Sequence, residues 1–480
     1  MDYKNIFKIL SIIGITLSLI FLLDVGVGII YHESYSQFIL FDGVFLGINL
    51  LIWFLLRKHK LELNIKDSIL VVNLLWLLLG IVGAFPLFIY TDISFASAFF
   101  EAISGFTTTG ATIYSDVESL PKIVLFHRSL MHWLGGLGVI VLGIGLLSMI
   151  NPTGSLSLFK AESTGIQVEK LTPRIKDTAL SLWIVYLVLT TMDMLLLKLF
   201  GMSWFDAINH AFSTLSTGGF STKNSSIGYF ENDAIIWTTT LFMILAGVNF
   251  LAHLRLYRRD LSGYKNEEMR WYIAIFLFLS LALTLVHIDR SGDGVYDAFK
   301  HSTFTIASVM TTTGFATIDY STWSNLAISI IFVGILMGGN TGSTAGGIKI
   351  IRHVIIFKSL ASELKKILHP NSIISVFIDN IKLKERILSA TFGFFTLFMI
   401  TIAVVTIYIF AQGYDSMTAV SAAFALVGNV GPGFSLVGPA NNFSFFSDFD
   451  KIFFSLAMII GRLECYTVFV LLGSSFWKKF

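Results

Sequence analysis

The sequence predicts an all-α polytopic membrane protein in which a unit of helix, short helix, loop and helix occurs four times, after two extra helices. Three observations predict this fold class. Of the 480 residues, 55% are hydrophobic and only 13% are charged, whereas a soluble protein would carry about 25% charged residues. Ten apolar stretches are long enough to cross a bilayer. Four shorter ones each run into a similar glycine-containing tetrapeptide.

The long apolar stretches are interpreted as membrane spans, because a helix needs roughly 20 apolar residues to cross the hydrocarbon core. The first resembles a signal peptide in its basic start at Lys4 and Lys8, but no small-residue cleavage site follows, so a retained helix is expected. The lone Cys465 excludes an intramolecular disulfide and is interpreted as a small packing residue. The expected spans lie near residues 8–31, 38–56, 68–90, 123–149, 178–200, 235–254, 271–288, 323–351, 388–411 and 452–476.

Four shorter amphipathic stretches lie between paired spans, and they are too short to cross a membrane. Such segments are tolerated at membrane depth only where protein or a water-filled cavity surrounds them. They lie near residues 93–107, 203–215, 294–311 and 415–428. Each leads into one of four tetrapeptides: Thr108-Thr109-Gly110-Ala111, Ser216-Thr217-Gly218-Gly219, Thr312-Thr313-Gly314-Phe315 and Asn429-Val430-Gly431-Pro432.

Basic residues concentrate in alternate loops, which the positive-inside rule places in the cytoplasm. The opposite loops hold few of them, namely Lys122, Lys223, Arg290, Lys300 and Lys451. Both termini are therefore expected in the cytoplasm, with the four tetrapeptides toward the outer face. This layout divides the chain into two accessory helices at 1–66 and four repeats at 67–150, 151–260, 261–387 and 388–480.

The four tetrapeptides suit a filter for a monovalent cation. An ion that enters a pore needs oxygen ligands to replace its water, and rings of backbone carbonyls supply them. Glycine adopts the required backbone angles without steric cost, and each short helix would point its partly negative C-terminal end at the pore. The segments lack the carboxylates that a divalent ion would want, so K⁺ fits better.

Any one tetrapeptide is most simply an ordinary glycine turn, but four in equivalent places favour a filter. The predicted K⁺-binding residues are Thr108, Thr109, Gly110, Ser216, Thr217, Gly218, Thr312, Thr313, Gly314, Asn429, Val430 and Gly431.

Nearly the whole chain resembles the Trk/Ktr/HKT superfamily of cation-uptake proteins, and within it the TrkH-type membrane subunit. The resemblance rests on the four filter segments, on the stretch from Arg128 to Gly138, on residues 338–349, and on Gly461-Arg462-Leu463-Glu464. The two additional N-terminal helices also look like the TrkH type. The resemblance implies four non-identical helix–pore-loop–helix repeats around a central pore, as in K⁺ channels, in the bacterial cytoplasmic membrane.

In this family a glycine in each filter repeat goes with K⁺ as the transported ion. The fourth repeat departs from the pattern at Asn429-Val430, which leaves the K⁺/Na⁺ ratio open.

A run of small polar residues interrupts the apolar stretch near 323–351. So many glycines disfavour a stable helix, and irregular backbone at this depth should line an aqueous pore. The alternative is a small-residue seam between packed helices, although the adjacent glycine pairs favour a loop. The resemblance makes this segment an intramembrane gating loop. The predicted gating residues are Gly338, Gly339, Asn340, Thr341, Gly342, Ser343, Thr344, Gly346, Gly347, Lys349 and Arg462.

Arg462 lies near the middle of the last span, where a charge is costly and usually functional or paired. One interpretation is a structural pair with Glu464 or another helix, but residues two apart on a helix do not face each other. The resemblance implies the other, in which the guanidinium lies below the filter, raises the barrier to cations and meets the loop. Lys349 is either part of this gate or an interfacial lysine.

Other polar residues near the spans are interpreted one by one. Glu101 either forms hydrogen bonds behind the filter or adds negative potential at the outer mouth. Asp24 is expected to serve helix packing. His127, Arg128 and His132 are expected to anchor the outer interface rather than bind a metal, because no carboxylate or cysteine accompanies them.

The short basic cytoplasmic loops contain no nucleotide-binding fingerprint, so any nucleotide control must come from another polypeptide. The resemblance implies a homodimer that docks on cytosolic TrkA-type nucleotide-binding subunits, with loops 151–177, 255–270 and 352–387 as the docking surface. Alternatively, the charges of these loops only set topology and contact anionic lipid. No cofactor of the chain's own and no nucleic-acid partner are expected.

Two functions from different classes fit these patterns. The first is gated K⁺ uptake. The second is a coupled secondary transporter, a K⁺/H⁺ or K⁺/Na⁺ symporter or a carrier of a small solute, which would use broken helices and a midplane site. Asp24 and Glu464 keep proton coupling open. An enzyme is not expected, because no nucleophile–base pair or metal cluster is evident in the membrane segments.

Overall fold

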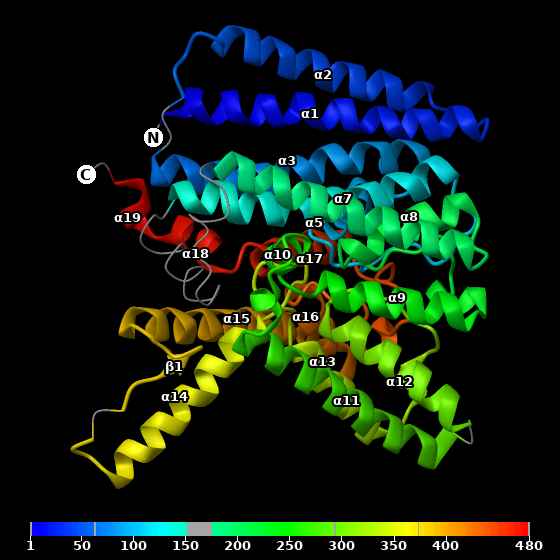
Figure 1. The fold of residues 1–480 in the computed structure, drawn as a ribbon. Helices are drawn as coiled ribbons and strands as arrows, with labels where there is room; N and C mark the ends of the chain where they lie inside the picture. Colours follow the sequence, from blue (N-terminus) through cyan, green and yellow to red (C-terminus); the bar gives the residue numbers. More distant parts are fainter. Residues whose placement is uncertain (1, 62–63, 151–174, 292–293, 373, 479–480) are drawn as a thin grey trace.

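The computed structural model describes the chain except for residues 1, 62–63, 151–174, 292–293, 373 and 479–480. The predicted fold class is confirmed, because the described part is almost entirely helical (Figure 1). In this part, six helices are long and apolar enough to cross a membrane, or up to eight spans if each of two bent helix pairs counts as one.

The two accessory helices, α1 (Tyr3–Ile30) and α2 (Ser36–Leu56), form an outer layer at the top of Figure 1. α1 packs against α2, α3 and α5. α2 buries only Phe38, Asp42 and Asn49, and its other face exposes large apolar side chains such as Leu40 and Leu55. An exposed face of this kind suits the lipid interior of a membrane.

Each repeat begins with a long helix that leads into a short one. The four short helices lie close to the predicted stretches, and three of them begin at a capping side chain, Ser94, Ser203 or Asp415. The pairs are α3 (Ile65–Tyr90) with α4 (Phe95–Phe106), α7 (Ile175–Leu199) with α8 (Trp204–Leu215), α11 (Glu267–Ser291) with α12 (Val295–Met310), and α15 (Glu385–Ala411) with α16 (Ser416–Val427).

The helix that closes each repeat differs from one repeat to the next. In repeat 1 it is continuous, as α5 (Lys122–Ile150). In repeat 2, α9 (Asp233–Ala246) and α10 (Phe250–Tyr257) meet at 98°. In repeat 4, α17 (Asp448–Arg462) and α18 (Tyr466–Leu472) meet at 117°, followed by α19 (Ser474–Trp477).

The stretches predicted as spans at 235–254 and 452–476 are thus each a bent pair of helices rather than one continuous helix. The second break has a local cause, since Glu464 and Cys465 take left-handed φ angles of 58° and 56° that a helix does not allow. In repeat 3, α13 (Asn325–Leu336) and α14 (Ile350–Leu368) are separated by residues 337–349, so the predicted interruption of the 323–351 stretch is confirmed.

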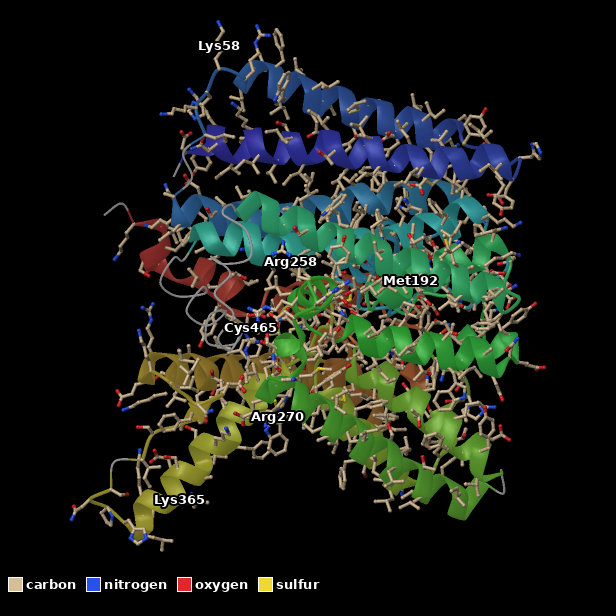
Figure 2. All side chains as sticks on the ribbon, viewed as in Figure 1. Lys58, Met192, Arg258, Arg270, Lys365 and Cys465 are labelled. Atoms are coloured by element: carbon tan, nitrogen blue, oxygen red, sulfur yellow. The ribbon has the colours of Figure 1, made fainter. Side chains whose placement is uncertain are left out.

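Short elements complete the described part of the chain. Both termini lie on the left side of Figure 1, and Figure 2 places Lys58 and Lys365 toward the same side. The short elements are the 3₁₀ turns η2 (Ser226–Phe230), η3 (Leu261–Tyr264), η4 (Tyr320–Thr322) and η5 (Ser435–Val437), and the antiparallel strands β1 (Phe377–Ile378) and β2 (Ile381–Lys382).

Candidate functional site: a ring of four carbonyls

The four short helices end in the same backbone geometry. In each repeat the residue after the helix cap has a left-handed φ, and the next residue donates its N–H to the carbonyl five positions earlier, at 2.8–2.9 Å. This conformation is rare for a β-branched residue and persists only where the surroundings impose it. The left-handed residues are Thr108 (φ 53°), Thr217 (56°), Thr312 (58°) and Asn429 (53°).

Two positions further on, each repeat places a glycine at positive φ against its neighbour. The angles are 82° at Gly110, 85° at Gly219, 82° at Gly314 and 94° at Gly431. A Cβ on these glycines would lie 2.0–2.6 Å from a carbonyl oxygen of another repeat. In chain order these oxygens belong to Gly218, Thr313, Val430 and Thr109. The contacts run from repeat 1 to 2, 2 to 3, 3 to 4 and back to 1, so the four strands form a closed ring.

The geometry corrects the predicted register in repeat 2 by one residue. Ser216 is the helix cap, which is the place of Thr107 in repeat 1. Thr217 matches Thr108, Gly218 matches Thr109, and the positive-φ glycine is Gly219. The sequence offered two adjacent glycines, and only the backbone angles decide between them.

A cavity of about 130 Å³ opens above this ring. All four positive-φ glycines line it, together with Arg128 from α5 and residues of the loops that follow the filter strands. Among the described residues that line the cavity there is no carboxylate. The site thus offers backbone oxygens at the ends of four short helices, which carry partial negative charge and favour a cation.

Side chains behind the ring hold the strands in different ways. In repeats 1 and 3, hydroxyl pairs brace the strand, with Thr107 Oγ1 2.7 Å from Thr109 Oγ1 and Thr311 Oγ1 2.8 Å from Thr313 Oγ1. In repeat 4, Asn429 donates its Nδ2 to Thr109 Oγ1 at 2.9 Å, which ties repeat 4 to repeat 1. The asparagine that departs from the Thr pattern therefore has a bracing contact of its own.

Glu101 lies behind the carbonyl ring, where the first of its two interpretations placed it. It is fully buried and accepts hydrogen bonds from the N–H of Ile113 at 2.9 Å and from Thr112 Oγ1 at 3.0 Å. It also forms an ion pair of 2.8 Å with Arg128, which is equally buried. The outer-mouth alternative for Glu101 is thus not supported.

The prediction that His127, Arg128 and His132 anchor the outer interface is wrong. All three are buried because α5 is enclosed by other helices on this face. His127 Nδ1 lies 2.8 Å from an oxygen of Asp24 on α1, so Asp24 serves helix packing as expected. The prediction considered only neighbours in the sequence, whereas the carboxylate partners Asp24 and Glu101 lie far away in the chain.

Residues 338–349 form the irregular segment expected between α13 and α14, directly beneath the ring. Gly346 donates its N–H to Thr312 Oγ1 at 2.6 Å, so the segment touches the ring strand of repeat 3. Thr344 Oγ1 donates to the carbonyls of Leu215 and Ala246 at 3.0 and 3.2 Å. A Cβ on Gly346 would meet the carbonyl of Gly428 at 2.6 Å. Repeats 2, 3 and 4 all contact the segment.

The N-terminal half of this segment is held by a second group of contacts. The N–H of Thr341 donates to Glu268 at 2.7 Å, and the N–H of Asn340 donates to the carbonyl of Gly247 at 2.8 Å. The carbonyl of Gly342 accepts from the N–H of Phe250 at 3.0 Å. Ser343 Oγ folds back onto the carbonyl of Asn340 at 2.6 Å, and Gly338 N–H donates to Ile348 at 2.9 Å.

Arg462 meets this segment. It is buried, and its Nη1 donates to the carbonyl of Thr344 at 3.0 Å. Glu464 instead pairs with Arg352 of α14 at 2.7 Å, in line with the argument that Arg462 and Glu464 do not face each other. Lys349 is buried and donates to the carbonyl of Ala345, so the interfacial alternative for Lys349 is wrong.

Several residues of the site were not expected from the sequence. Thr107 and Thr311 brace the filter, and Phe220 packs on both Arg128 and His132. The one available signal was alignment of the repeats on the helix ends, which places Thr107, Ser216 and Thr311 at one position. Nothing local in the sequence indicated Phe220.

Comparison with known proteins shows the family of the chain. The chain matches the TrkH family, described as a cation transport protein, over residues 36–478. It is 36% identical to the Trk system potassium uptake protein TrkH of Salmonella typhimurium and 35% identical to that of Escherichia coli K12, with all of each chain covered. The chain belongs to the TrkH family. The crystal structure of the potassium transporter TrkH from Vibrio parahaemolyticus matches the model with a TM-score of 0.91 at 34% identity, covering all of both chains.

Membership in the TrkH family makes this chain an integral membrane transport protein rather than an enzyme. The match to the solved TrkH structure extends over the whole chain, including the accessory helices.

Proposed function

We propose that this TrkH-family chain takes up K⁺ across the bacterial cytoplasmic membrane through the carbonyl ring. The relatives are named potassium uptake proteins, and the closed ring of carbonyls is the observation that carries the proposal. Backbone oxygens replace the water of a monovalent ion, and a filter without carboxylates disfavours a divalent one. The inside-negative potential drives the ion inward, with both termini in the cytoplasm.

We infer that the 338–347 segment and Arg462 form the gate. The segment lies beneath the ring, and the buried guanidinium adds a positive charge next to it. A positive charge beside a cation pathway raises the barrier to conduction. If the segment moved, its hydrogen bonds with Thr312 and Arg462 would be replaced by hydrogen bonds with water. A ligand that binds elsewhere on the protein and favours the moved position would therefore open the pore.

We further propose a homodimer controlled by cytosolic TrkA-type nucleotide-binding subunits. Two of the three loops expected to dock them contact each other in the structure. The N–H of Glu267 donates to Asp379 at 2.8 Å, and Lys358 pairs with Glu267. Residues 352–387 include most of α14, which begins where the gating segment ends. A partner that moved these residues would thus move α14 and also pull on α11. The third loop, 151–177, falls mostly outside the described residues.

No specific observation favours the coupled-transporter alternative. The two carboxylates considered for proton coupling both have partners, Asp24 with His127 and Glu464 with Arg352.

Cation flux into proteoliposomes tests the proposal. K⁺, Rb⁺ and Na⁺ uptake would be compared for the wild type, for Gly314→Ser and for the control Gly47→Ser. A Cβ at Gly314 would lie 2.3 Å from the Val430 oxygen, whereas a Cβ at Gly47 on α2 meets nothing within 4 Å. We expect K⁺ and Rb⁺ flux above Na⁺ that is lost or unselective only in Gly314→Ser. Equal behaviour of the two variants would refute the filter, and a silent wild type would be retested with its cytosolic partner.

A further inference from the structure

One filter strand lacks a side chain that the other three have. At the position whose carbonyl faces the neighbouring repeat, repeats 1, 3 and 4 carry Thr109, Thr313 and Val430, but repeat 2 carries Gly218. Gly219 follows directly, so this strand contains two consecutive glycines. Two glycines give this strand more conformational freedom than the strands of the other repeats. Its Gly218 carbonyl must nevertheless be placed as accurately as the ring carbonyls of the other repeats.

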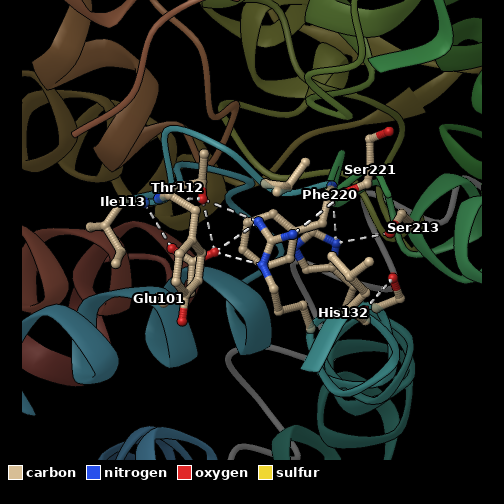
Figure 3. Close-up of polar contacts among 12 residues, drawn as sticks. Glu101, Thr112, Ile113, His132, Ser213, Phe220 and Ser221 are labelled. Atoms are coloured by element: carbon tan, nitrogen blue, oxygen red, sulfur yellow. Dashed lines mark hydrogen bonds and ion pairs between the residues drawn. The ribbon is translucent and has the colours of Figure 1, made fainter. Parts of the chain in front are cut away.

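A histidine from repeat 1 occupies the space of the missing side chain. A Cβ on Gly218 would lie 2.3 Å from Nδ1 of His132, which projects from α5. The imidazole is fully buried, and Nδ1 accepts a hydrogen bond from the N–H of Phe220 at 3.4 Å. Its ring stacks on the Phe220 ring with 4.0 Å between centroids and 16° between planes. Nδ1 also lies 3.3 Å from Ser213 Oγ (Figure 3).

Arg128 holds the same strand from one helical turn earlier on α5. Its guanidinium carbon lies 4.0 Å from the centre of the Phe220 ring, a cation–π contact, and Nη1 donates to the carbonyl of Ser221 at 3.4 Å. Glu101 fixes the guanidinium from repeat 1. Figure 3 shows how these contacts connect the outer segments of repeats 1 and 2.

We propose that His132 and Arg128 are positioning residues that fix the filter strand of repeat 2 and thereby contribute to K⁺ selectivity. His132 substitutes for the side chain that Gly218 lacks, and both residues immobilise Phe220, two positions beyond Gly218. The Gly218 carbonyl lies against Gly110 of repeat 1, so any displacement of the strand alters the carbonyl ring itself. The inference rests on the proposed K⁺ filter.

A reciprocal pair of variants tests the inference. His132→Ala leaves the two-glycine strand unsupported, and Gly218→Ala drives a methyl group into the imidazole. Gly218 is not among the residues with positive φ, and the three atoms nearest to an added Cβ all belong to His132. We expect each single variant to lower the K⁺/Na⁺ permeability ratio about three- to tenfold, as expected for loss of an aromatic contact. The double variant should recover most of the ratio, because its methyl group occupies the vacated space.

Gly219→Ala is the matched control. Gly219 has a φ of 85°, and an added Cβ would lie 2.0 Å from the Thr313 oxygen. Both features strain an alanine independently of His132, so adding His132→Ala should not rescue this variant. The ratio is measured by reversal potential on purified protein that elutes as a single species, which makes it independent of the amount of folded protein. His132→Phe, which keeps the ring, should retain more selectivity than His132→Ala.

The outcomes separate this inference from the proposed function. A selective wild type, an unselective Gly219→Ala and an unchanged His132→Ala would overturn the positioning role and leave the filter intact. A Gly218→Ala defect that His132→Ala does not relieve would also overturn it. A wild type that conducts no cation, even with its cytosolic partner, would overturn both.

Discussion

The carbonyl ring and the region beneath it are built on opposite principles. In the ring, all four repeats share one backbone geometry, in which a helix cap is followed by a residue at left-handed φ and, two positions further on, by a glycine at positive φ. Beneath it, no two closing helices match. α5 is continuous, α9 and α10 bend by 98°, α17 and α18 bend by 117°, and repeat 3 inserts the 337–349 segment between α13 and α14.

The difference separates two requirements of an ion pathway. An ion on the axis needs equivalent oxygens on all sides, so drift in one repeat would be costly. Under the proposed gating, control needs a movable part, and the 337–349 segment is present in one repeat alone among the described residues, where Gly346 ties it to Thr312 of the ring. The His132–Gly218 contact fits this view, since the repeat without a side chain at this position is contacted there by a side chain of its neighbour.

The largest expected effect comes from breaking the ring. Replacing Gly110 by alanine places a Cβ 2.2 Å from the Gly218 oxygen at a φ of 82°, so we expect K⁺ selectivity to be abolished. If the ring is symmetric, the same change at Gly219, Gly314 and Gly431 has an equal effect. Reversal potentials in K⁺/Na⁺ gradients measure it. One tolerant glycine among the four would show that the ring is not four-fold.

The second prediction concerns stability behind the ring. Glu101→Gln leaves the buried Arg128 without its counter-charge, which should lower the free energy of unfolding by about 3–5 kcal/mol. Thermal unfolding in detergent measures this loss. The control is Glu118→Gln, which breaks the partly exposed pair with Lys223 at 3.7 Å and should cost less than about 1 kcal/mol. Equal losses would contradict a special role for the buried pair.

The sequence predicted the parts of the molecule that rest on local patterns. Hydropathy located the long helices and the four short ones, and runs of glycine located the irregular segment in repeat 3. Patterns of this kind could not predict the choice between Gly218 and Gly219, because both permit a filter and only the backbone angles differ. They also could not predict the partners of Arg128 and His132, because the residues that bury these side chains are distant in the sequence and change nothing in the local pattern.

The third prediction addresses the region beneath the ring. Arg462→Gln removes the positive charge but keeps an amide that can donate to the Thr344 carbonyl. We expect K⁺ flux through the protein without its cytosolic partner to rise about tenfold. A positive charge near the pathway raises the free-energy barrier to a cation by roughly 1.4 kcal/mol at an intermediate dielectric. The K⁺/Na⁺ ratio should stay unchanged, since the ring is untouched. Stopped-flow Rb⁺ uptake measures the flux.

Arg462→Lys is the matched control, because it keeps the charge and should keep the barrier. A rise in flux with both variants would assign the effect to the hydrogen bond with Thr344 rather than to charge. A change in selectivity would mean that the ring and the gate are not separable.

The smallest expected effect lies at the outer mouth. Lys223 lines the cavity above the ring, and Glu118 neutralises it only partly across 3.7 Å in a solvent-exposed setting. Lys223→Gln should therefore raise K⁺ entry about twofold at low ionic strength, because one unit charge acts weakly through water. The gain should vanish above about 0.15 M salt, where the Debye length is roughly 8 Å or less and exposed charges are screened beyond that distance. Glu118→Gln should lower entry under the same conditions. A gain that persists in high salt would mean that Lys223 acts on the ring through structure, and the outer mouth would then belong to the symmetric part of the molecule rather than to its adjustable surroundings.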